Sequence, residues 1–454
     1  MIFPDKKILY LNDILLAILL AHSVYRDIQL ESEYPGDLRN RVVGARLQKD
    51  GKLPYHFHWH EGEGIRYYDG EENAWILDIT REKKNPAESD INKITASPFF
   101  HELMYPICDL PQRTISRIWF WGQYLLLASM VGMISGLTND KRKKWLLLNA
   151  GILFTATEAW KSLIFAGQIY LIEGFLICCI LTALVKNKKY LIIFGGLCAA
   201  IFVLTRPIAI VIFIPFLFTY RKYLTFLSYA FGGLIIYLIF IFINPKETAL
   251  YKDYLSGMKM QVQVHQDAND SIPPLRAWKA PRFSNIEGFD ISGSERTADR
   301  NPVKVYSENG NFYELYYKIF HRKLPLVILN AGLVFTVVAL SLLFFLNQRI
   351  HSRQTIQVLL FSFTLYMVVE FFSPVLRHQY NTVQWFPLVL AGFLIVPDWK
   401  NGVFVLLVLG LLLNICNFAW IPVRHTIGEL CWLSALLTII FSSRYNKTEW
   451  KELS

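Results

Sequence analysis

The sequence predicts an all-α polytopic membrane protein, a bundle of about twelve transmembrane helices with two large non-cytoplasmic loops. Several apolar segments approach the ~20 residues with which a helix crosses a hydrocarbon layer ~30 Å thick. Only helices and closed barrels satisfy their backbone groups in lipid, and these segments lack the alternation of barrel strands. The expected spans are residues 8–25, 115–137, 145–160, 167–185, 190–205, 207–220, 223–243, 324–346, 355–373, 382–396, 402–420 and 427–442.

The distribution of basic residues supports this number of spans. With the amino terminus inside, every short basic segment falls on the cytoplasmic side, as the positive-inside rule requires. These segments are Lys6-Lys7, Lys141-Arg142-Lys143-Lys144, Lys186 with Lys188-Lys189, Arg221-Lys222, Arg349 with Arg353, Lys400, and Arg444 with Lys447. The formal net charge of +10 is thus explained by topology, so no nucleic-acid partner is needed, and a basic inner face suits anionic lipids.

The spans divide the chain into six parts. These are residues 1–25 (first transmembrane helix), 26–112 (first non-cytoplasmic loop), 113–243 (helices 2 to 7), 244–323 (second non-cytoplasmic loop), 324–442 (helices 8 to 12) and 443–454 (cytoplasmic tail). The first span has the features of a cleaved signal peptide or of an uncleaved anchor. We favour the anchor, because cleavage would place the new amino end outside and release the loop that follows. The pair of spans that flanks Arg206-Pro207 is either two helices or one broken helix.

The two large loops are expected to form a binding or catalytic layer over the helical base. The second is rich in Pro, Gly, Asn and Ser between Gln266 and Asn311, which predicts irregular structure. No internal repeat is evident, which disfavours a secondary carrier. Charged residues inside spans are few, and each is a functional candidate by default: Glu158, Glu173 and Glu370. Of the six cysteines only Cys108 is expected in an external loop, and their spacing predicts neither a disulfide framework nor a metal site.

Asp37 begins the polar run that follows the first span. Transfer of a group from a lipid phosphate to a hydroxyl needs a base, and a placed carboxylate contributes about 10²–10⁴-fold in rate. The alternative is an N-cap, because Leu38, Val42 and Ala45 lie on one side of a possible helix. From the spacing alone both interpretations stay open.

Arg206 lies beside Pro207 at the expected external end of an apolar helix. Its planar guanidinium suits a bidentate phosphate contact, and an arginine is costly to hold at the bilayer edge without a partner. The alternative is an interfacial anchor that extends to water, which the sequence alone favours.

The first loop also contains a histidine alternation and clustered aromatic residues. His56, His58 and His60 would lie on one strand face, but three consecutive positions close a tetrahedral shell poorly and no cysteine assists. We therefore expect no metal there, and a polar strand or turn instead. The aromatic residues stack on sugar rings or, as we favour, anchor the loop at the head-group level; they are Trp59, Tyr67, Tyr68 and Trp75.

Four short blocks occur in an order that resembles one family of membrane enzymes. The blocks are Asp37, Gly44-Ala45, Leu47, Gly51 and Pro54-Tyr55; Ser97-Pro98-Phe99-Phe100 with Tyr105-Pro106 and Leu110-Pro111; Gly167-Gln168, Gly195-Gly196-Leu197 and Thr205-Arg206-Pro207; and Ser373-Pro374 with His378-Gln379-Tyr380. Together they resemble the GT-C class of polyprenyl-phosphate-sugar-dependent glycosyltransferases, especially the DUF2029 or glycosyltransferase 87 family of mannosyltransferases. This chain departs from the family pattern at Tyr170, where Asn is frequent, and at Arg206, where Lys is common.

The resemblance implies roles for individual residues. Asp37 is the implied general base, which deprotonates an acceptor hydroxyl as that hydroxyl attacks the anomeric carbon opposite the lipid phosphate, so that configuration is inverted. Arg206 is the implied donor-phosphate residue, with His378, Gln168 and Glu158 as further donor-phosphate or substrate-binding candidates.

The resulting expectation is an integral glycosyltransferase of the bacterial inner membrane with its active site on the periplasmic face. Its partners would be a lipid-linked sugar donor, a glycan or glycolipid acceptor and the bilayer, and it would need no cofactor or metal. The cytoplasmic connections contain no Gly-rich phosphate loop, which favours a lipid-linked donor over a nucleotide sugar. The alternatives are an O-antigen or exopolysaccharide polymerase and a carrier or flippase without chemistry.

Overall fold

The computed structural model describes residues 6–31, 35–55, 94–267, 310–320, 322, 324–350, 355–374, 377–416 and 423–442, and every element in these ranges is helical. The helices are α1 (Lys6–Glu31), α2 (Gly36–Lys49), α4 (Pro98–Met104), α5 (Gln112–Ser135), α6 (Lys141–Thr155), α7 (Glu158–Ala166), α8 (Tyr170–Lys186), α9 (Lys189–Thr205), η3 (Pro207–Phe213), α10 (Ile214–Leu217), α11 (Tyr220–Ile243), α12 (Pro245–Asp267), α16 (Phe312–Phe320), α17 (Leu326–Ile350), α18 (Thr355–Phe371), η4 (Gln379–Trp385), α19 (Phe386–Ile395), α20 (Gly402–Ile415) and α21 (Arg424–Phe441). The all-α expectation is confirmed for this part of the chain.

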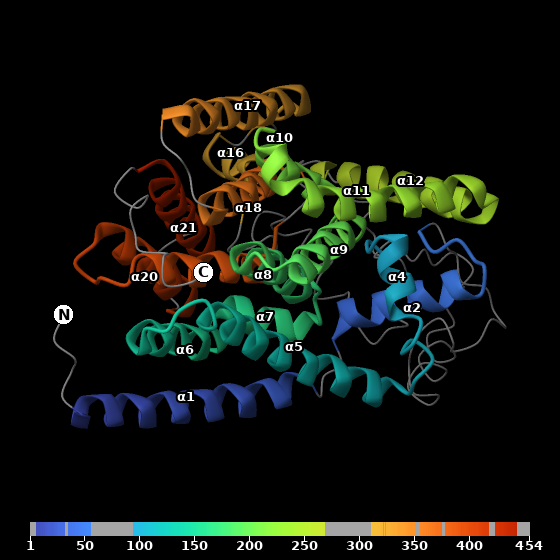
Figure 1. Cartoon of the computed structure of the whole chain (residues 1–454). Coiled ribbons are helices and arrows are strands. Elements are labelled where there is room, and N and C mark those ends of the chain that lie inside the picture. Colours follow the sequence, from blue (N-terminus) through green and yellow to red (C-terminus); the bar gives the residue numbers. More distant parts are fainter. Residues whose placement is uncertain are drawn as a thin grey trace.

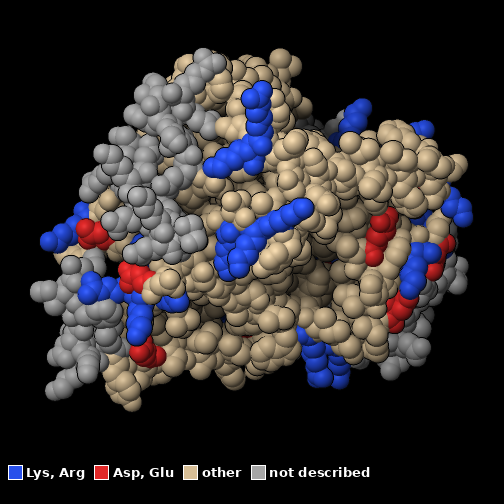
Figure 2. Space-filling model, in the orientation of Figure 1, with Lys and Arg blue, Asp and Glu red and all other residues tan. Residues whose placement is uncertain are grey.

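Three described helices are long and apolar enough to cross a membrane: α5, α11 and α17. The pair α7 and α8 passes the same test as one span bent by 116°. Shorter apolar helices, among them α9, α18 and α20, lie beside them, so twelve spans stay a prediction. The exposed faces fit lipid: Val327 and Phe335 of α17 are 80% and 74% exposed. Most of the face in Figure 2 is uncharged surface, with Lys and Arg in separate groups.

Three expected spans differ from the helices that form. The expected span 382–396 begins inside the 3-10 segment η4 and is an α-helix only from Phe386. The expected helix 145–160 ends at Thr155, and Thr157 begins α7 by accepting a hydrogen bond from the Trp160 amide at 3.0 Å. The expected helix 207–220 is instead a 3-10 segment, η3, followed by the single turn α10. Two prolines, Pro207 and Pro215, have no backbone N–H for a regular helix there.

The centre of the molecule is built around α8, which packs against α5, α9, α18 and η4. Figure 1 shows α8 and α9 in the middle, α1 along the lower edge and α17 along the upper edge. Parts of both expected external loops, α2, α4 and α12, lie together at one end of this view. The Tyr55 amide donates to the Asp253 carboxylate at 3.0 Å, so the two expected loops are in contact.

Candidate active site

Asp37 lies in the first turn of α2, two residues after the N-cap residue Pro35. No side chain caps this helix, so the N-cap interpretation of Asp37 is wrong. Its carboxylate instead accepts a hydrogen bond on Oδ2 from the Gln168 amide. The apolar side of the helix is fully buried, as the spacing of Leu38 and Val42 predicts.

Gln168 reaches Asp37 because the chain breaks between α7 and α8. Gly167 ends α7 in the left-handed conformation with φ of 67°, which glycine adopts without strain. Gln168 is 4% exposed, and its Oε1 accepts from the guanidinium of Arg41. Arg41 also donates to the backbone carbonyl of Asp37 at 2.7 Å. Three side chains from two distant segments thus form one hydrogen-bonded group.

Arg206 follows the last residue of α9 and forms a bidentate ion pair with Glu370 at the end of α18. Arg206 donates to the Glu370 oxygens from Nη2 at 3.0 Å and from Nε at 3.3 Å. The Arg206 side chain is 30% exposed, whereas that of Glu370 is 1% exposed. Part of the guanidinium fork that the family resemblance assigns to phosphate is therefore occupied by Glu370.

A row of rings joins the Arg206 region to the Asp37 region. The Arg206 guanidinium lies 5.6 Å from the ring centre of Tyr170, which stacks on Tyr380 at 5.5 Å. The Tyr380 ring stacks in turn on His378 at 4.9 Å. Desolvation and then the nearby Asp37 carboxylate raise the pKa of the Tyr380 hydroxyl. Desolvation lowers the pKa of His378, and the Asp37 carboxylate acts in the opposite direction. The structure therefore brings Asp37, Gln168, His378 and Arg206 together around α8 and η4.

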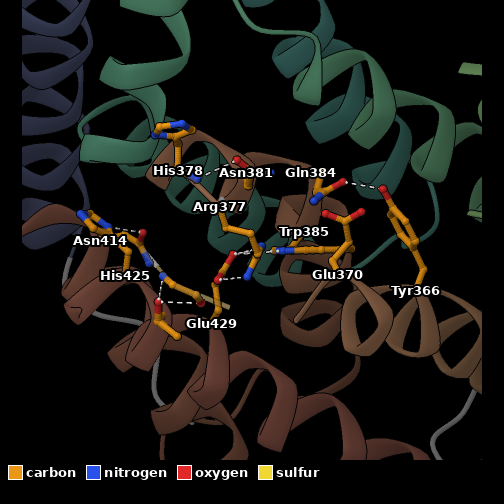
Figure 3. Close-up of polar contacts among 12 residues, drawn as sticks. Tyr366, Glu370, Arg377, His378, Asn381, Gln384, Trp385, Asn414, His425 and Glu429 are labelled. Carbon is orange, nitrogen blue, oxygen red and sulfur yellow. Dashed lines mark hydrogen bonds and ion pairs between the residues drawn. The ribbon is translucent and has the colours of Figure 1, made fainter. Parts of the chain in front are cut away.

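A buried ion pair holds the segment that leads into η4 (Figure 3). Arg377 and Glu429 are 1% and 0% exposed and form two hydrogen bonds of 2.9 Å. The Trp385 indole donates to the same carboxylate at 3.1 Å. His378 follows Arg377 directly, so the Arg377–Glu429 ion pair fixes the backbone position from which the His378 side chain extends.

The remaining expected site residues lie elsewhere. Glu158 is at the first turn of α7, the opposite end from Gly167, and pairs with Lys161 at 3.6 Å. His56, His58 and His60, and the aromatic residues Trp59, Tyr67, Tyr68 and Trp75, lie outside the described residues. Within the described ranges there is no group of three metal-ligating side chains.

A second aspartate, Asp27, is buried near this layer but is bonded differently. It is 0% exposed on α1 and accepts from the Tyr124 hydroxyl at 2.6 Å and from the Trp160 indole at 2.7 Å. Arg26 pairs with it at 2.6 Å. Both of its oxygens have donors, whereas Oδ1 of Asp37 has no hydrogen-bond partner among the described residues. Of the two aspartates, only Asp37 has a carboxylate oxygen without a hydrogen-bond donor among the described residues.

The sequence did not single out Arg41 or Tyr380 as functional residues. Arg41 had a local signal, because residues four apart lie on the same helix face and Arg41 follows Asp37 by four. Tyr380 had only its place beside His378 in the fourth block. Its contact with Tyr170 joins segments 210 positions apart in the sequence, which no local pattern predicts.

The model of glycosyltransferase family 87 matches residues 95–279 of the chain. This range includes α4, Gln168 and Arg206, while Asp37 and His378 lie outside it. No curated protein and no solved structure matches the chain. The match confirms the resemblance to glycosyltransferase family 87 over this part of the chain and supports glycosyltransferase activity.

Proposed function

We propose that the protein is an integral membrane enzyme that moves a sugar from a polyprenyl-phosphate donor to a lipid-linked or polymeric glycan. The sugar is mannose or a similar hexose or pentose, and transfer takes place on the non-cytoplasmic face of the bacterial inner membrane. The observation that supports this most is the row of rings from Arg206 to His378, with the Asp37 carboxylate close to His378 and Tyr380 and bonded to Gln168. A general base and a phosphate-binding cation are the two groups that such a transfer needs.

Asp37 acts as the general base in this proposal. Its Oδ1 removes the proton of the acceptor hydroxyl while that oxygen forms a bond to the anomeric carbon. The bond from the anomeric carbon to the phosphate oxygen breaks on the opposite face, and the polyprenyl phosphate leaves with the electron pair. Attack opposite to the leaving group inverts the configuration at the anomeric carbon.

Arg206 contributes positive charge to the departing phosphate. Glu370 binds Nε and Nη2, and among the described residues Nη1 has no hydrogen-bond partner. Nη1 therefore remains to bind a phosphate oxygen, and the pairing with Glu370 fixes the plane of the guanidinium. His378 is a second group for donor phosphate or acceptor. The resemblance also implies Glu158 and Gln168, but Glu158 pairs with Lys161 and the Gln168 amide is bonded to Asp37 and Arg41.

The test is transfer of labelled sugar by the purified protein in lipid nanodiscs. A panel of polyprenyl-phosphate sugars is offered with a glycolipid extract as acceptor, and nucleotide sugars are offered in parallel. We expect transfer from one of the polyprenyl-phosphate sugars, lowered about 10²–10⁴-fold in Asp37→Asn because the base is lost. The matched control is Asp109→Asn, since Asp109 is 42% exposed in the same expected loop and pairs with Lys49.

Two outcomes would overturn the proposal. One is undiminished transfer by correctly folded Asp37→Asn protein, and the other is transfer from nucleotide sugars alone. Products that contain many added repeats would indicate the polymerase instead. Movement of a lipid-linked glycan across the membrane without transfer would indicate the carrier.

A further inference from the structure

The break between α7 and α8 brings the chain into backbone contact with the start of α2. A Cβ atom on Gly167 would lie 2.6 Å from the Cβ atoms of both Pro35 and Leu38. No side chain fits at that distance, so only glycine allows α2 to approach this closely. The residue after this glycine, Gln168, is thereby fixed against the first turn of α2.

The Gln168 amide bridges Asp37 and Arg41, and its orientation is fixed by chemistry. A guanidinium has only donors, so the amide oxygen must face Arg41. The amide nitrogen then faces the carboxylate, which is the arrangement in the structure. Arg41 is 8% exposed and is held a second time by the backbone carbonyl of Asp37.

The bridge has an electrostatic consequence for a base. Arg41 follows Asp37 by four residues on one helix face, which is the spacing at which Asp and Arg pair directly. A carboxylate in direct contact with a guanidinium is held in its ionised form and accepts a proton less readily. Gln168 occupies the position between the two groups and gives the carboxylate a neutral donor instead.

We propose that Gln168 is a positioning residue that orients the Asp37 carboxylate and keeps the Arg41 guanidinium from binding it directly. The proposal rests on the role of Asp37 as the general base. In this proposal the α7–α8 break serves catalysis, because it positions the Gln168 amide beside the Asp37 carboxylate. Gln168 makes no contact with the donor phosphate.

The experiment measures the pH dependence of kcat for two variants with opposite expectations. In Gln168→Ala, Arg41 becomes free to pair with Asp37, so the low-pH limb of the profile moves to lower pH. In Gln168→Glu, a second carboxylate faces Asp37, so the same limb moves to higher pH. We expect kcat to fall by about 10–10²-fold in both variants, because the base is misplaced, with the donor KM unchanged.

A double variant and a control complete the test. In Gln168→Ala combined with Arg41→Met, the low-pH limb returns toward its wild-type position while kcat stays low. The control is Gln123→Ala, since Gln123 is 2% exposed on α5 and no hydrogen bond among the described residues joins it to Asp37. The low-pH limb of its profile should stay at the wild-type position. Gln168→Glu conserves side-chain volume, so it remains informative if Gln168→Ala does not fold.

Several results would overturn the proposal. Lower kcat in both variants without movement of the limb indicates a merely structural role for Gln168. A raised donor KM with unchanged kcat indicates that Gln168 binds the donor. If Asp37→Asn abolishes transfer and one of these two results is found for the Gln168 variants, only the positioning role of Gln168 fails. If Asp37→Asn is active, the proposed function fails as well.

Discussion

Two aspartates near the start of the chain show how surroundings give one residue type different uses. Asp27 is fully buried and bonded to donors from α1, α5 and α7, so its carboxylate joins three helices. Asp37 has a single side-chain donor on one oxygen and is half-buried. A buried carboxylate whose oxygens all accept hydrogen bonds stabilises the fold. A general base instead needs a carboxylate oxygen that can take up a proton.

At the residue scale we expect Asp27→Ala to destabilise the protein. Removal of the buried carboxylate leaves Tyr124 and Trp160 without their acceptor, at about 1–3 kcal/mol for each unsatisfied donor, and leaves the partly exposed Arg26 without its partner. Thermal unfolding of the purified variant measures the effect. Asp13→Ala is the control on the same helix, because Asp13 is exposed and accepts one 3.3 Å bond from Trp145. Equal Tm values for both variants would refute a joining role for Asp27.

At the scale of elements, the sequence predicts the continuous apolar helices well and the interrupted ones poorly. The expected span 223–243 corresponds to α11, and 355–373 corresponds to α18, because apolar length alone defines such helices. The expected span 167–185 begins close to the α7–α8 break, but nothing in the sequence marks α7 as a separate short helix, since both halves are apolar and glycine is also tolerated inside helices. Only its contact with Pro35 and Leu38 shows why Gly167 ends α7.

The packing of α4 on α2 depends on a neutral histidine. His101 of α4 is 0% exposed, lies against Gly44 of α2, and places Nδ1 3.3 Å from the Gln48 side-chain oxygen. Burial, and then the charge of Arg41, lowers the pKa of His101 to about 3. The folded protein therefore takes up fewer protons here than the unfolded chain between about pH 3 and 6.5.

We accordingly expect His101 to reduce stability as the pH falls. The stabilising contribution of the neutral ring is complete above about pH 6.5 and is lost progressively toward pH 3. The neighbouring Glu102 acts oppositely, since burial raises its pKa to about 7 and its contribution is lost as pH rises from about 4.5 to 7. Tm measured across this pH range should thus fall less steeply on acidification in His101→Gln than in the wild type. His22→Gln, at an exposed position on α1, should keep the wild-type slope, and an unchanged slope in His101→Gln would contradict the account.

At the scale of the whole molecule, the candidate site depends on two external segments that meet over the helical base. In Figure 1, α2 and α4 from the first segment and α12 from the second lie at the same end of the molecule. The sequence indicates two large loops on one face from charge and span number. It does not indicate that they touch, because the Tyr55–Asp253 hydrogen bond joins residues 198 positions apart.

This arrangement requires that the two ends of α5 face opposite sides of the membrane. Its 24 residues extend about 36 Å as a helix, enough for a hydrocarbon layer of about 30 Å. Asp109 precedes α5 on the expected non-cytoplasmic side, and Lys141 follows it in a basic cytoplasmic segment. We therefore expect a cysteine at Asp109 to react with a membrane-impermeant maleimide in intact cells, and a cysteine at Lys141 to react only after the membrane is permeabilised.

Background labelling in this measurement would come from the native cysteines, and their burial determines which of them must be replaced. Cys416 and Cys431 are half-buried and are replaced by serine, while the other four are buried and protected from the reagent. Each protein with one introduced cysteine must retain sugar transfer, so that labelling reports on the active topology. Reaction of both positions in intact cells, or of neither, would place the two ends of α5 on one side. The expected topology would then be wrong, and Asp37 would no longer have a defined face of the membrane on which to meet a lipid-linked donor.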